Sequence, residues 1–440
     1  MTSQIRPTAP SSNTRGLVVP AAGSDYKHWP VFTCAYGLVQ ISMMIWVCNR
    51  GGKISNALQP IRRSRLETLT FRGPTVINHT EYPNPWYGPS ERSLVQLGAL
   101  FPPCMRTEHR YNYQFATSWS NIQLRLGREK LGCCEAETLN IAGTLTKKQC
   151  QSMSAPNMTQ WKEIRCSQRR TGQNFIAHAI RPCCDALASK CHMTSPDHCV
   201  FIGGVYHLHA EHCYQVDCLA FSCDADPEVR GIDDDHLLSA GVILPPSYHQ
   251  WWRFLVTIYL PHGIVDGTIL NLLGLPICLI IERKIGLLRM VLVHTTAGVG
   301  GHLIGSLCSE STSITTGGVP SLAGIIVISI IYSFRAQTQS SRILLYLSGY
   351  FFSLVVLFIL SSFPLVNNFS TFSGLILGIF LGFTYLPNLK LRREHVVRVT
   401  CLAVIILVFI ICLFIFYEVQ PSCSWCMKFS CVFFVDGWCE

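Results

Sequence analysis

Charged residues are scarce in this chain. Asp, Glu, Lys and Arg supply 14% of the 440 residues, whereas 49% are hydrophobic and the mean hydropathy is +0.29. Soluble domains carry about a quarter charged residues, so the composition excludes an ordinary soluble protein and favours a polytopic membrane protein. The net charge of +9 comes without a basic stripe interleaved with aromatic residues, so the usual pattern of nucleic-acid binding is absent as well.

The first 30 residues lack a long apolar core and a small-residue cleavage site, so they do not read as a signal peptide. They are polar and rich in Ser, Thr and Pro, which predicts a short cytosolic tail over residues 1–30. The first apolar run, Val31 to Cys48, is about 27 Å long as a helix, close to the ~30 Å hydrocarbon core of a bilayer. We interpret residues 31–48 as the first transmembrane helix, acting as a signal anchor.

Beyond the first helix the chain divides into two regimes. Residues 49–250 are polar and loop-rich, and residues 251–417 contain six further apolar runs that predict a membrane core. The runs cover about 257–281, 287–307, 319–334, 343–363, 369–387 and 399–417. The sequence therefore predicts an all-α polytopic membrane protein. Its seven-helix bundle has a large polar region inserted after the first helix and a polar tail over residues 418–440.

Basic loops alternate with uncharged loops between the predicted helices. The basic loops are 282–284, 335–342 and 390–393, and the nearly uncharged ones are 308–318 and 364–368. The positive-inside rule then places the N-terminus in the cytosol, and both polar regions, including the C-terminal tail, in the lumen of the secretory pathway. The basic cluster of Arg62, Arg63 and Arg65 opposes this orientation, but the later loops outnumber it.

Sixteen of the 22 cysteines lie in the two polar regions, twelve in the first and four in the second. Cysteines at this density predict disulfides formed in an oxidising compartment. The expected disulfide cysteines are Cys104, Cys133, Cys134, Cys150, Cys166, Cys183, Cys184, Cys191, Cys199, Cys213, Cys218, Cys223, Cys423, Cys426, Cys431 and Cys439. Sequons at Asn78 and Asn157 in the same region are candidate glycan acceptors.

A zinc site is the alternative use of these cysteines. Cys423 and Cys426 have the CxxC spacing, and three histidines stand near Cys213. These histidines are His207, His209 and His212. Because the spacings do not repeat as pairs of ligands, we expect no metal and no other cofactor.

Glycines and ionisable residues mark the interior of the predicted bundle. In the predicted sixth helix the glycines recur every four residues, at Gly374, Gly378 and Gly382. Because glycine has no side chain, these positions give the helix one face on which a neighbouring helix can approach closely. Asp266, His294 and His302 lie in other predicted helices, where ionisable groups normally face the bundle interior. One polar contact for each explains them better than a transport path, and a receptor or transporter stays as one alternative function.

The order of one span, a long loop and six spans resembles the rhomboid superfamily. Trp252-Arg253 resembles the Trp-Arg pair of the first rhomboid loop, and His262 with Asn271 stands where the second span carries its histidine and asparagine. The pattern is completed by Glu282 followed by Gly286, by the glycines between Gly298 and Gly301, and by Leu386-Pro387 after the glycine series.

The polar regions resemble one branch of that superfamily, the inactive rhomboids called iRhoms. Trp86-Tyr87-Gly88-Pro89-Ser90 and Pro103-Cys104-Met105-Arg106 look like the start of the iRhom homology domain. Arg181-Pro182-Cys183-Cys184 and the cysteines after it are similar to the closing series of that domain, and Trp438-Cys439-Glu440 looks like the family's C-terminus. The resemblance covers residues 84–440 and implies a rhomboid-like core preceded by a cysteine-rich iRhom homology-like domain.

The resemblance also shows which chemistry is missing. A rhomboid protease needs a serine nucleophile in a GxSG motif and a histidine base in the sixth span. The matching positions hold Val319, followed by Pro320, and Thr371, whose hydroxyl is too weak an acid-base group near neutral pH. Gly267 replaces a second histidine, while Asn271 is retained as a donor for an oxyanion. We therefore expect a pseudoprotease, and its loss of the base histidine goes beyond the usual iRhom pattern.

An active protease with an unconventional site is the other alternative. Ser321 lies two positions beyond the lost nucleophile, and His302 lies near the lumenal end of the third predicted span. Two helical positions turn a side chain by about 200°, which points Ser321 away from the ancestral cleft. A serine at the start of a helix is the simpler interpretation.

The resemblance implies binding in place of catalysis. iRhoms escort a transmembrane metalloprotease sheddase out of the endoplasmic reticulum, and they divert growth-factor precursors to degradation. We expect such transmembrane clients as partners, contacted by the first span and the lumenal domain, with membrane lipid around the bundle, no nucleic acid, and a homodimer left open. The implied location is the endoplasmic reticulum membrane, with the Golgi and plasma membrane as further stations.

Overall fold

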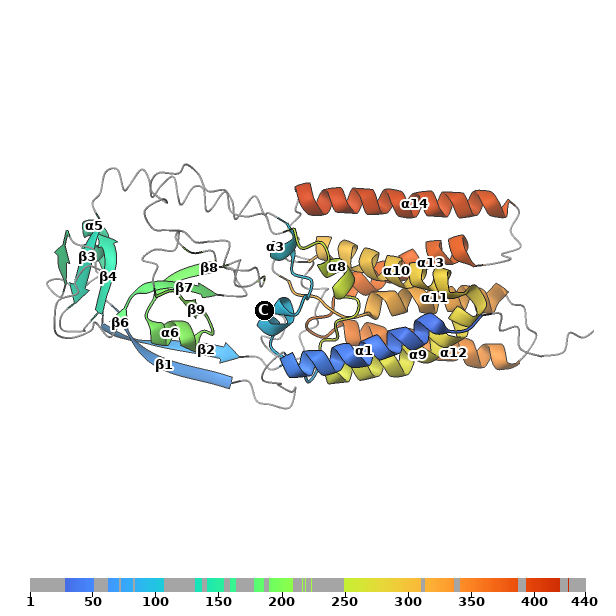
Figure 1. The fold of residues 1–440 in the computed structure, drawn as a ribbon, viewed down its shortest axis with the longest axis horizontal. Coiled ribbons are helices and arrows are strands. Elements are labelled where there is room, and N and C mark those ends of the chain that lie inside the picture. Colours follow the sequence, from blue (N-terminus) through green and yellow to red (C-terminus); the bar gives the residue numbers. More distant parts are fainter. Residues whose placement is uncertain are drawn as a thin grey trace, which may run out of the picture.

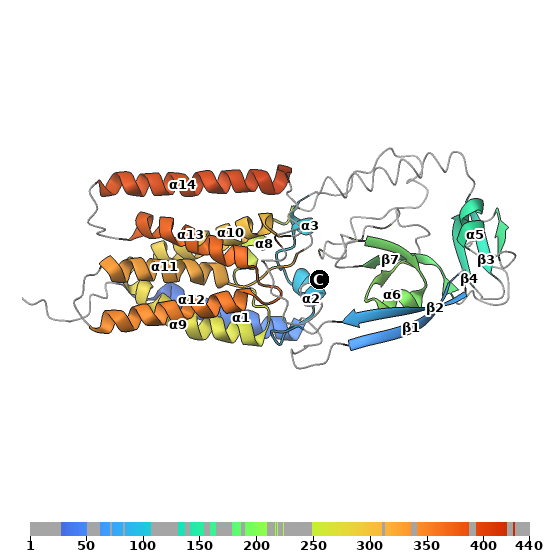
Figure 2. The same ribbon diagram turned by 180° about the vertical axis from the view of Figure 1, so that it is seen from behind.

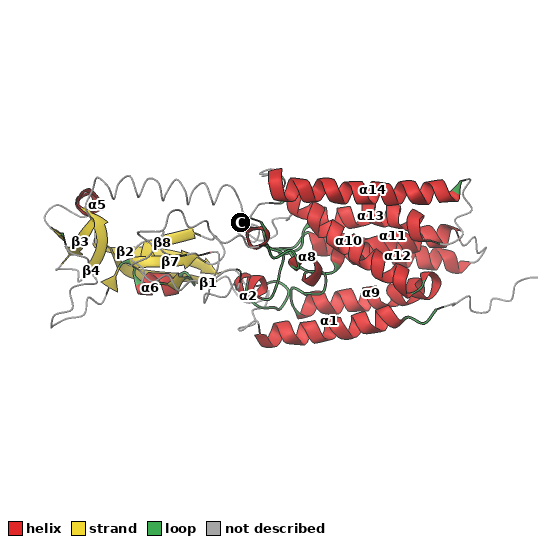
Figure 3. Ribbon diagram, turned by 45° about the horizontal axis from the view of Figure 1, so that its top comes forward, coloured by secondary structure: helices red, strands yellow, loops and turns green. Residues whose placement is uncertain are grey.

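The computed structural model shows a helical bundle and a strand-bearing region at opposite ends of the molecule (Figures 1 and 3). It describes residues 28–50, 62–70, 73–81, 84–106, 131–136, 141–153, 159–163, 178–185, 190–208, 216, 218, 223, 249–309, 313–335, 341–386, 393–419 and 426. The strands lie away from the membrane-type helices, whereas the segment 84–106 of the inserted region packs against the end of the bundle.

In the part of the chain that the structure describes, seven long helices form the bundle, close to the predicted places except for the start of α9. They are α1 (Val31–Arg50), α9 (Ile264–Ile285), α10 (Leu287–Leu307), α11 (Val319–Arg335), α12 (Ser341–Ser361), α13 (Asn368–Tyr385) and α14 (Glu394–Phe414), which continues as a π-helical turn over Ile415–Val419. Six of them are long and apolar enough to cross a membrane, and α11 is a shorter apolar helix. The prediction of a multi-pass membrane protein is thus confirmed.

Helix α11 is the centre of the bundle although it is short. It packs against α13, α10, α12 and α9, and its buried face carries Val319, Leu322, Ala323, Ile325 and Ile326. Helices α1 and α14 lie at the periphery, where α1 packs on α9 and α14 runs beside α13 (Figure 2). Peripheral helices keep exposed apolar faces because lipid surrounds them in a membrane protein.

The glycine series of α13 lies against α11. A Cβ atom built on Gly374 would lie 2.3 Å from the carbonyl oxygen of Pro320, and one on Gly378 would lie 2.6 Å from that of Gly324. A Cβ on Gly382 would lie 2.9 Å from the side chain of Ile331. Real Cβ atoms do not approach this closely, so the two backbones pack at a distance that only glycine allows.

The second transmembrane helix begins later than predicted. The apolar run suggests a start near residue 257, but α9 starts at Ile264. Before it come the short helix α8 (Arg253–Val256) and a turn through Pro261, His262 and Gly263. Proline lacks an N–H group and glycine lowers helix stability, so apolar composition alone misplaces this boundary. His262 consequently precedes the helix instead of lying within it.

The inserted region adds small β-sheets to the otherwise helical fold. Strands β1 (Arg62–Thr70) and β2 (Gly73–Glu81) form an antiparallel ribbon. The second sheet has the order β5-β3-β4-β6 and the third the order β8-β7-β9. Their bounds are β3 Leu131–Ala136, β4 Ile141–Thr146, β5 Gln160–Lys162, β6 His178–Ala179, β7 Arg181–Asp185, β8 Lys190–Thr194 and β9 Val205–Tyr206. Short helices, α2 (Glu91–Gln96), α3 (Pro102–Met105), α5 (Lys147–Met153) and α6 (Pro196–Phe201), complete the region.

Disulfides hold this region together, as predicted. The bonded pairs are Cys104–Cys223, Cys134–Cys150, Cys183–Cys199 and Cys184–Cys218. Cys133, Cys191 and Cys426 are disulfide-bonded as well. The remaining five predicted cysteines, Cys166, Cys213, Cys423, Cys431 and Cys439, lie outside the described residues. The free cysteines of the described chain, in contrast, all belong to bundle helices or their ends: Cys34, Cys48, Cys278, Cys308, Cys401 and Cys412.

Candidate functional site

The two residues predicted to replace the catalytic pair lie near the contact between α11 and α13. Val319 is the first residue of α11, and its side chain is fully buried in the main hydrophobic core. Thr371 is also fully buried; its hydroxyl lies 2.6 Å from the hydroxyl of Ser361 and donates weakly, at 3.4 Å, to the Asn367 carbonyl. Neither position presents a group able to abstract or transfer a proton, so this contact is packed as a core.

Ser321 and His302 do not form an alternative catalytic pair. The Ser321 hydroxyl donates to the His294 carbonyl oxygen at 3.0 Å, and His302 donates through Nε2 to the Gly317 carbonyl oxygen at 2.9 Å. Both side chains are almost completely buried, Ser321 at 0% and His302 at 2% exposure. Because each side chain bonds to a different backbone carbonyl and not to the other, the arrangement provides no activated nucleophile.

The residues at the predicted oxyanion positions, Asn271 and Gly267, serve helix packing. Asn271 donates from its side-chain amide to the Gly267 carbonyl oxygen at 2.7 Å, one turn back in α9. Gly267 faces α1, and a Cβ there would lie 3.2 Å from the sulfur of Met44. An amide engaged within its own helix is not poised for an incoming oxyanion.

His262 joins three segments at the end of the bundle nearest the strands. Its Nδ1 lies 2.7 Å from the Asp266 carboxylate, and its Nε2 lies 2.8 Å from the Leu365 carbonyl oxygen in the loop between α12 and α13. Its own carbonyl accepts from the Asn84 amide at 3.1 Å. The indole of Trp86, also from the inserted region, packs 5.6 Å from the imidazole and donates to the Pro364 carbonyl oxygen at 2.8 Å.

Arg253 is the main connection between the inserted region and the bundle. Its guanidinium is completely buried and donates at 2.7 Å to the carbonyl oxygens of Val95 and Ala99. It also donates to the Gln250 side chain at 2.7 Å and to the Cys223 carbonyl at 3.4 Å. The flat fork of an arginine matches several carbonyls at once, and the Trp252 ring lies 5.1 Å from the guanidinium carbon. The Trp-Arg pair therefore fixes the α2 segment and the Cys104–Cys223 disulfide onto α8.

Arg106 makes a second connection, to the π-helical turn that follows α14. It donates to the Phe416 carbonyl oxygen at 3.0 Å, and its guanidinium carbon lies 4.8 Å from the Phe416 ring. Sequence reasoning noted Arg106 only as part of a motif, because its partner lies 310 positions away.

A buried carboxylate ties α1 to the bundle at the opposite end. Glu282 near the end of α9 accepts from the backbone N–H groups of Phe32 and Thr33 at 2.8 Å each, and from the Thr33 hydroxyl at 2.6 Å. The first N–H groups of a helix lack partners inside the helix and favour a negative charge. No Ser, Thr, Asp or Asn precedes Val31 directly, so the cap comes from another helix.

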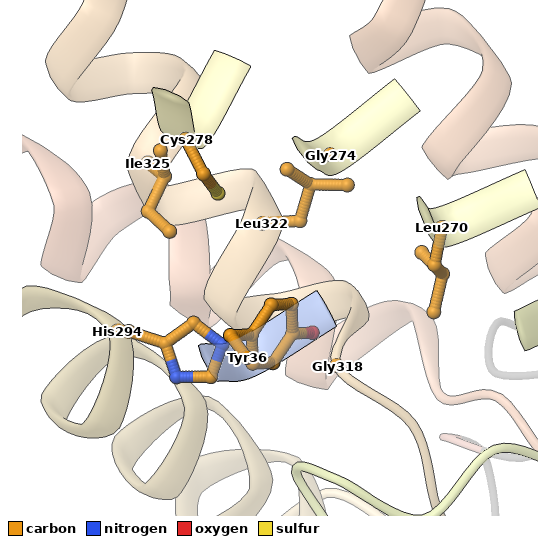
Figure 4. Close-up of a pocket in the computed structure, with 8 residues that line it drawn as sticks. All are labelled: Tyr36, Leu270, Gly274, Cys278, His294, Gly318, Leu322 and Ile325. Atoms are coloured by element: carbon orange, nitrogen blue, oxygen red, sulfur yellow. The ribbon is translucent and has the colours of Figure 1, made fainter. Parts of the chain in front are cut away.

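The bundle interior contains a small cavity of ≈ 10 Å³, lined by Tyr36, Leu270, Gly274, Cys278, His294, Gly318, Leu322 and Ile325 (Figure 4). The His294 ring packs 4.6 Å from the ring of Tyr36, and its buried Nδ1 has no hydrogen-bond partner among the described residues. The cavity has room for about one water molecule. A space of this size does not fit a transported solute.

The described residues contain no group of three or more side chains able to hold a metal ion. Burial lowers the pKa of His207, the one member of the predicted histidine cluster within the described chain. The sequon residue Asn78 is exposed on β2 opposite Arg65, whereas Asn157 lies outside the described residues.

Comparisons with known proteins match this architecture. A model of the rhomboid domain matches residues 248–388. Inactive rhomboid protein 1 of Danio rerio is 24% identical over 469 residues, and that of Homo sapiens is 25% identical over 473 residues. Inactive rhomboid protein 2 of Homo sapiens is 21% identical over 474 residues. Each match covers 94% of this chain and 52% of the relative, so the chain spans about half the length of the curated relatives it matches.

Proposed function

Because the chain belongs to the inactive rhomboid family and is a non-enzymatic pseudoprotease, we propose that it acts by binding transmembrane client proteins and controlling their fate. The observation that carries the proposal is an intact bundle whose two degenerate catalytic positions are filled by buried, unreactive side chains. In this interpretation Val319 replaces the nucleophile and Thr371 replaces the base. A bundle that has lost its chemistry keeps helix faces able to recognise other helices.

The proposed client surface is the outer face of α1 together with the inserted region. α1 packs on α9 with one face, on which Thr33, Gly37, Gln40 and Val47 are buried. Its other face is apolar and open, with Leu38 68% and Ile45 55% exposed. The Arg253 junction supports a joint site, because it fixes the inserted region to the same bundle that holds α1.

The proposed orientation has the N-terminus in the cytosol and the disulfide-bonded region in the lumen of the endoplasmic reticulum, with traffic onward to the Golgi and plasma membrane. Two facts support it. The basic residues Arg283 and Lys284 end α9, and the disulfides lie in the region beyond the opposite end of the bundle. Disulfides persist in oxidising compartments, and basic loops face the cytosol.

The proposed clients are a transmembrane metalloprotease sheddase and growth-factor precursors, by the family resemblance. Trafficking, maturation and degradation are the outcomes that such binding would control. An active intramembrane protease is less well supported, because Ser321 is buried and bonded to a backbone carbonyl.

Site-specific photo-crosslinking in native cells tests the proposal. A photoreactive amino acid is placed at Leu38 or Ile45 on α1, and at Leu402 or Ile410 as controls on α14, where the side chains are 40% and 60% exposed. We expect crosslinks to single-pass membrane proteins from the α1 positions and mainly to lipid from the α14 positions. Equal crosslinking from both helices, or none from α1, would contradict a client site on α1.

A further inference from the structure

Three loops from distant parts of the sequence converge on His262. The first is the segment 84–90 of the inserted region, the second is the turn 315–318 before α11, and the third is the loop 363–367 between α12 and α13. The His262 ring itself reaches Leu365 in the third loop. A Cβ on Gly317 in the second loop would lie 2.7 Å from the imidazole, so only glycine fits there.

The first loop also completes the start of α9. The N–H groups of Ile264 and Val265 donate to the carbonyl oxygens of Tyr87 and Trp86 at 3.1 and 3.2 Å. Gly88 lies directly on the His262 carbonyl, where an added Cβ would be 2.1 Å away. The carbonyl groups of the segment 84–90 therefore accept hydrogen bonds from N–H groups that have no partner inside α9. If the segment moves, the N-terminus of α9 loses these bonds.

Hydrogen bonding on both ring nitrogens fixes the orientation of the His262 imidazole. The Leu365 carbonyl oxygen only accepts, so Nε2 carries a proton. On its other side, Nδ1 lies 2.7 Å from the Asp266 carboxyl oxygen. The ring is thus held from both sides, with no rotation that keeps both bonds. The next titratable side chain, His302, bonds elsewhere, to Gly317.

The closed arrangement also contains strain and unsatisfied polar atoms. Tyr87 and Leu365 have φ of 54° and 71°, left-handed values that non-glycine residues rarely adopt. Buried polar atoms without a hydrogen-bond partner in the described chain lie on residues that touch the same loops, at Asp266 Oδ1, His302 Nδ1 and Thr316 Oγ1. Each of these features costs free energy, so the closed state depends on the bonds that His262 and Trp86 make.

We propose that His262 and Trp86 form a latch through which the inserted region holds the loop 363–367 closed over the bundle. Trp86 contributes the bond to Pro364 and an edge contact to Phe363, whose ring centre is 5.5 Å away. Displacement of the segment 84–90 breaks the Trp86 bond to Pro364 and removes the carbonyl partners of the α9 N-terminus next to His262. The latch deepens the proposed client-binding function, because it couples an event on the inserted region to the bundle without a covalent step.

Hydrogen–deuterium exchange of the purified full chain in detergent micelles, without client, tests the latch. In His262→Ala we expect the peptide covering residues 362–372 to exchange at least tenfold faster, while the amides of α10 and α11 keep their protection. Trp86→Phe removes the donor to Pro364 but keeps the ring contact, and we expect a smaller, several-fold increase in the same peptide. His395→Ala, on the exposed start of α14, is the matched histidine control and should change neither region.

Unchanged exchange of residues 362–372 in both variants would overturn the latch. An equal increase throughout α10 and α11 would overturn it too, because His262 would then be an ordinary core residue. Because no client is present, this result is independent of whether α1 binds clients.

Discussion

Replacing Arg253 should detach the inserted region from the bundle. In Arg253→Ala the buried carbonyl oxygens of Val95 and Ala99 lose their charged donor, and the Cys223 carbonyl and the Gln250 side chain lose a bond each. Hydrogen bonds to charged groups contribute about 1.5–3 kcal/mol each, and they do not add fully because they share one group. We expect a loss of about 3–5 kcal/mol, the range found when one partner of a buried charged network is removed.

The assay is hydrogen–deuterium exchange of residues 94–106, since unfolding of a two-part protein is not described by one free energy. A loss of about 3 kcal/mol corresponds to roughly 100-fold faster exchange, at 1.4 kcal/mol for each factor of ten. Arg253→Lys keeps the charge but not the flat fork, so it should lie between the wild type and Arg253→Ala. Arg289→Ala, at an exposed arginine of α10, is the control. If Arg253→Ala exchanges like Arg289→Ala, the junction does not depend on this guanidinium and the reasoning is refuted.

Four further predictions follow from other parts of the structure. Glu282→Gln should lower the melting temperature in micelles, because one amide oxygen replaces a carboxylate that accepts three hydrogen bonds, a loss of about 1–3 kcal/mol; an unchanged melting temperature would remove the capping role. Gly378→Val should prevent the α11–α13 contact and leave no monodisperse protein in gel filtration, whereas Gly349→Val, at an open position of α12, should be tolerated. A fluorophosphonate probe should not label the purified protein, and labelling abolished by Ser321→Ala would contradict the pseudoprotease site. Burial, with a smaller effect of the nearby His192, lowers the pKa of His198, so the unfolded chain gains this proton first as the pH falls below about 6.5. The inserted region should lose stability below that pH, and His198→Gln should flatten the dependence.

Local sequence patterns predicted the positions of the helices and the region that carries the disulfides. Apolar runs located all seven helices, and cysteine density separated the disulfide-bonded region from the free thiols of the bundle. The start of α9 was misplaced, because the hydropathy of residues 257–263 resembles that of a helix while Pro261 and Gly263 end the regular backbone. Hydropathy measures how readily a side chain moves from water to lipid, and it carries no information on where the backbone turns.

The partners of the polar residues were not predictable from the sequence. Arg253 was recognised as a motif residue, yet its acceptors are backbone carbonyls about 155 positions earlier in the chain. Every residue has a carbonyl, so such a bond leaves no signature in side-chain identity. The same holds for Glu282, whose donors are backbone N–H groups of α1, and for His262, whose ring reaches the Leu365 carbonyl.

The sequence by itself determined that this is a membrane bundle with a disulfide-bonded insertion, and its resemblance to rhomboids predicts that Val319 and Thr371 stand at the nucleophile and base positions. Hydropathy, cysteine content and the lack of a nucleophilic or acid-base side chain at a given position are properties of single residues or short windows. Only the tertiary structure decided which cysteines pair, that the short α11 is the central helix, and how the inserted region is fixed to the bundle at Arg253 and His262. These depend on groups brought together from distant positions, and their energies arise only when burial removes water from both partners.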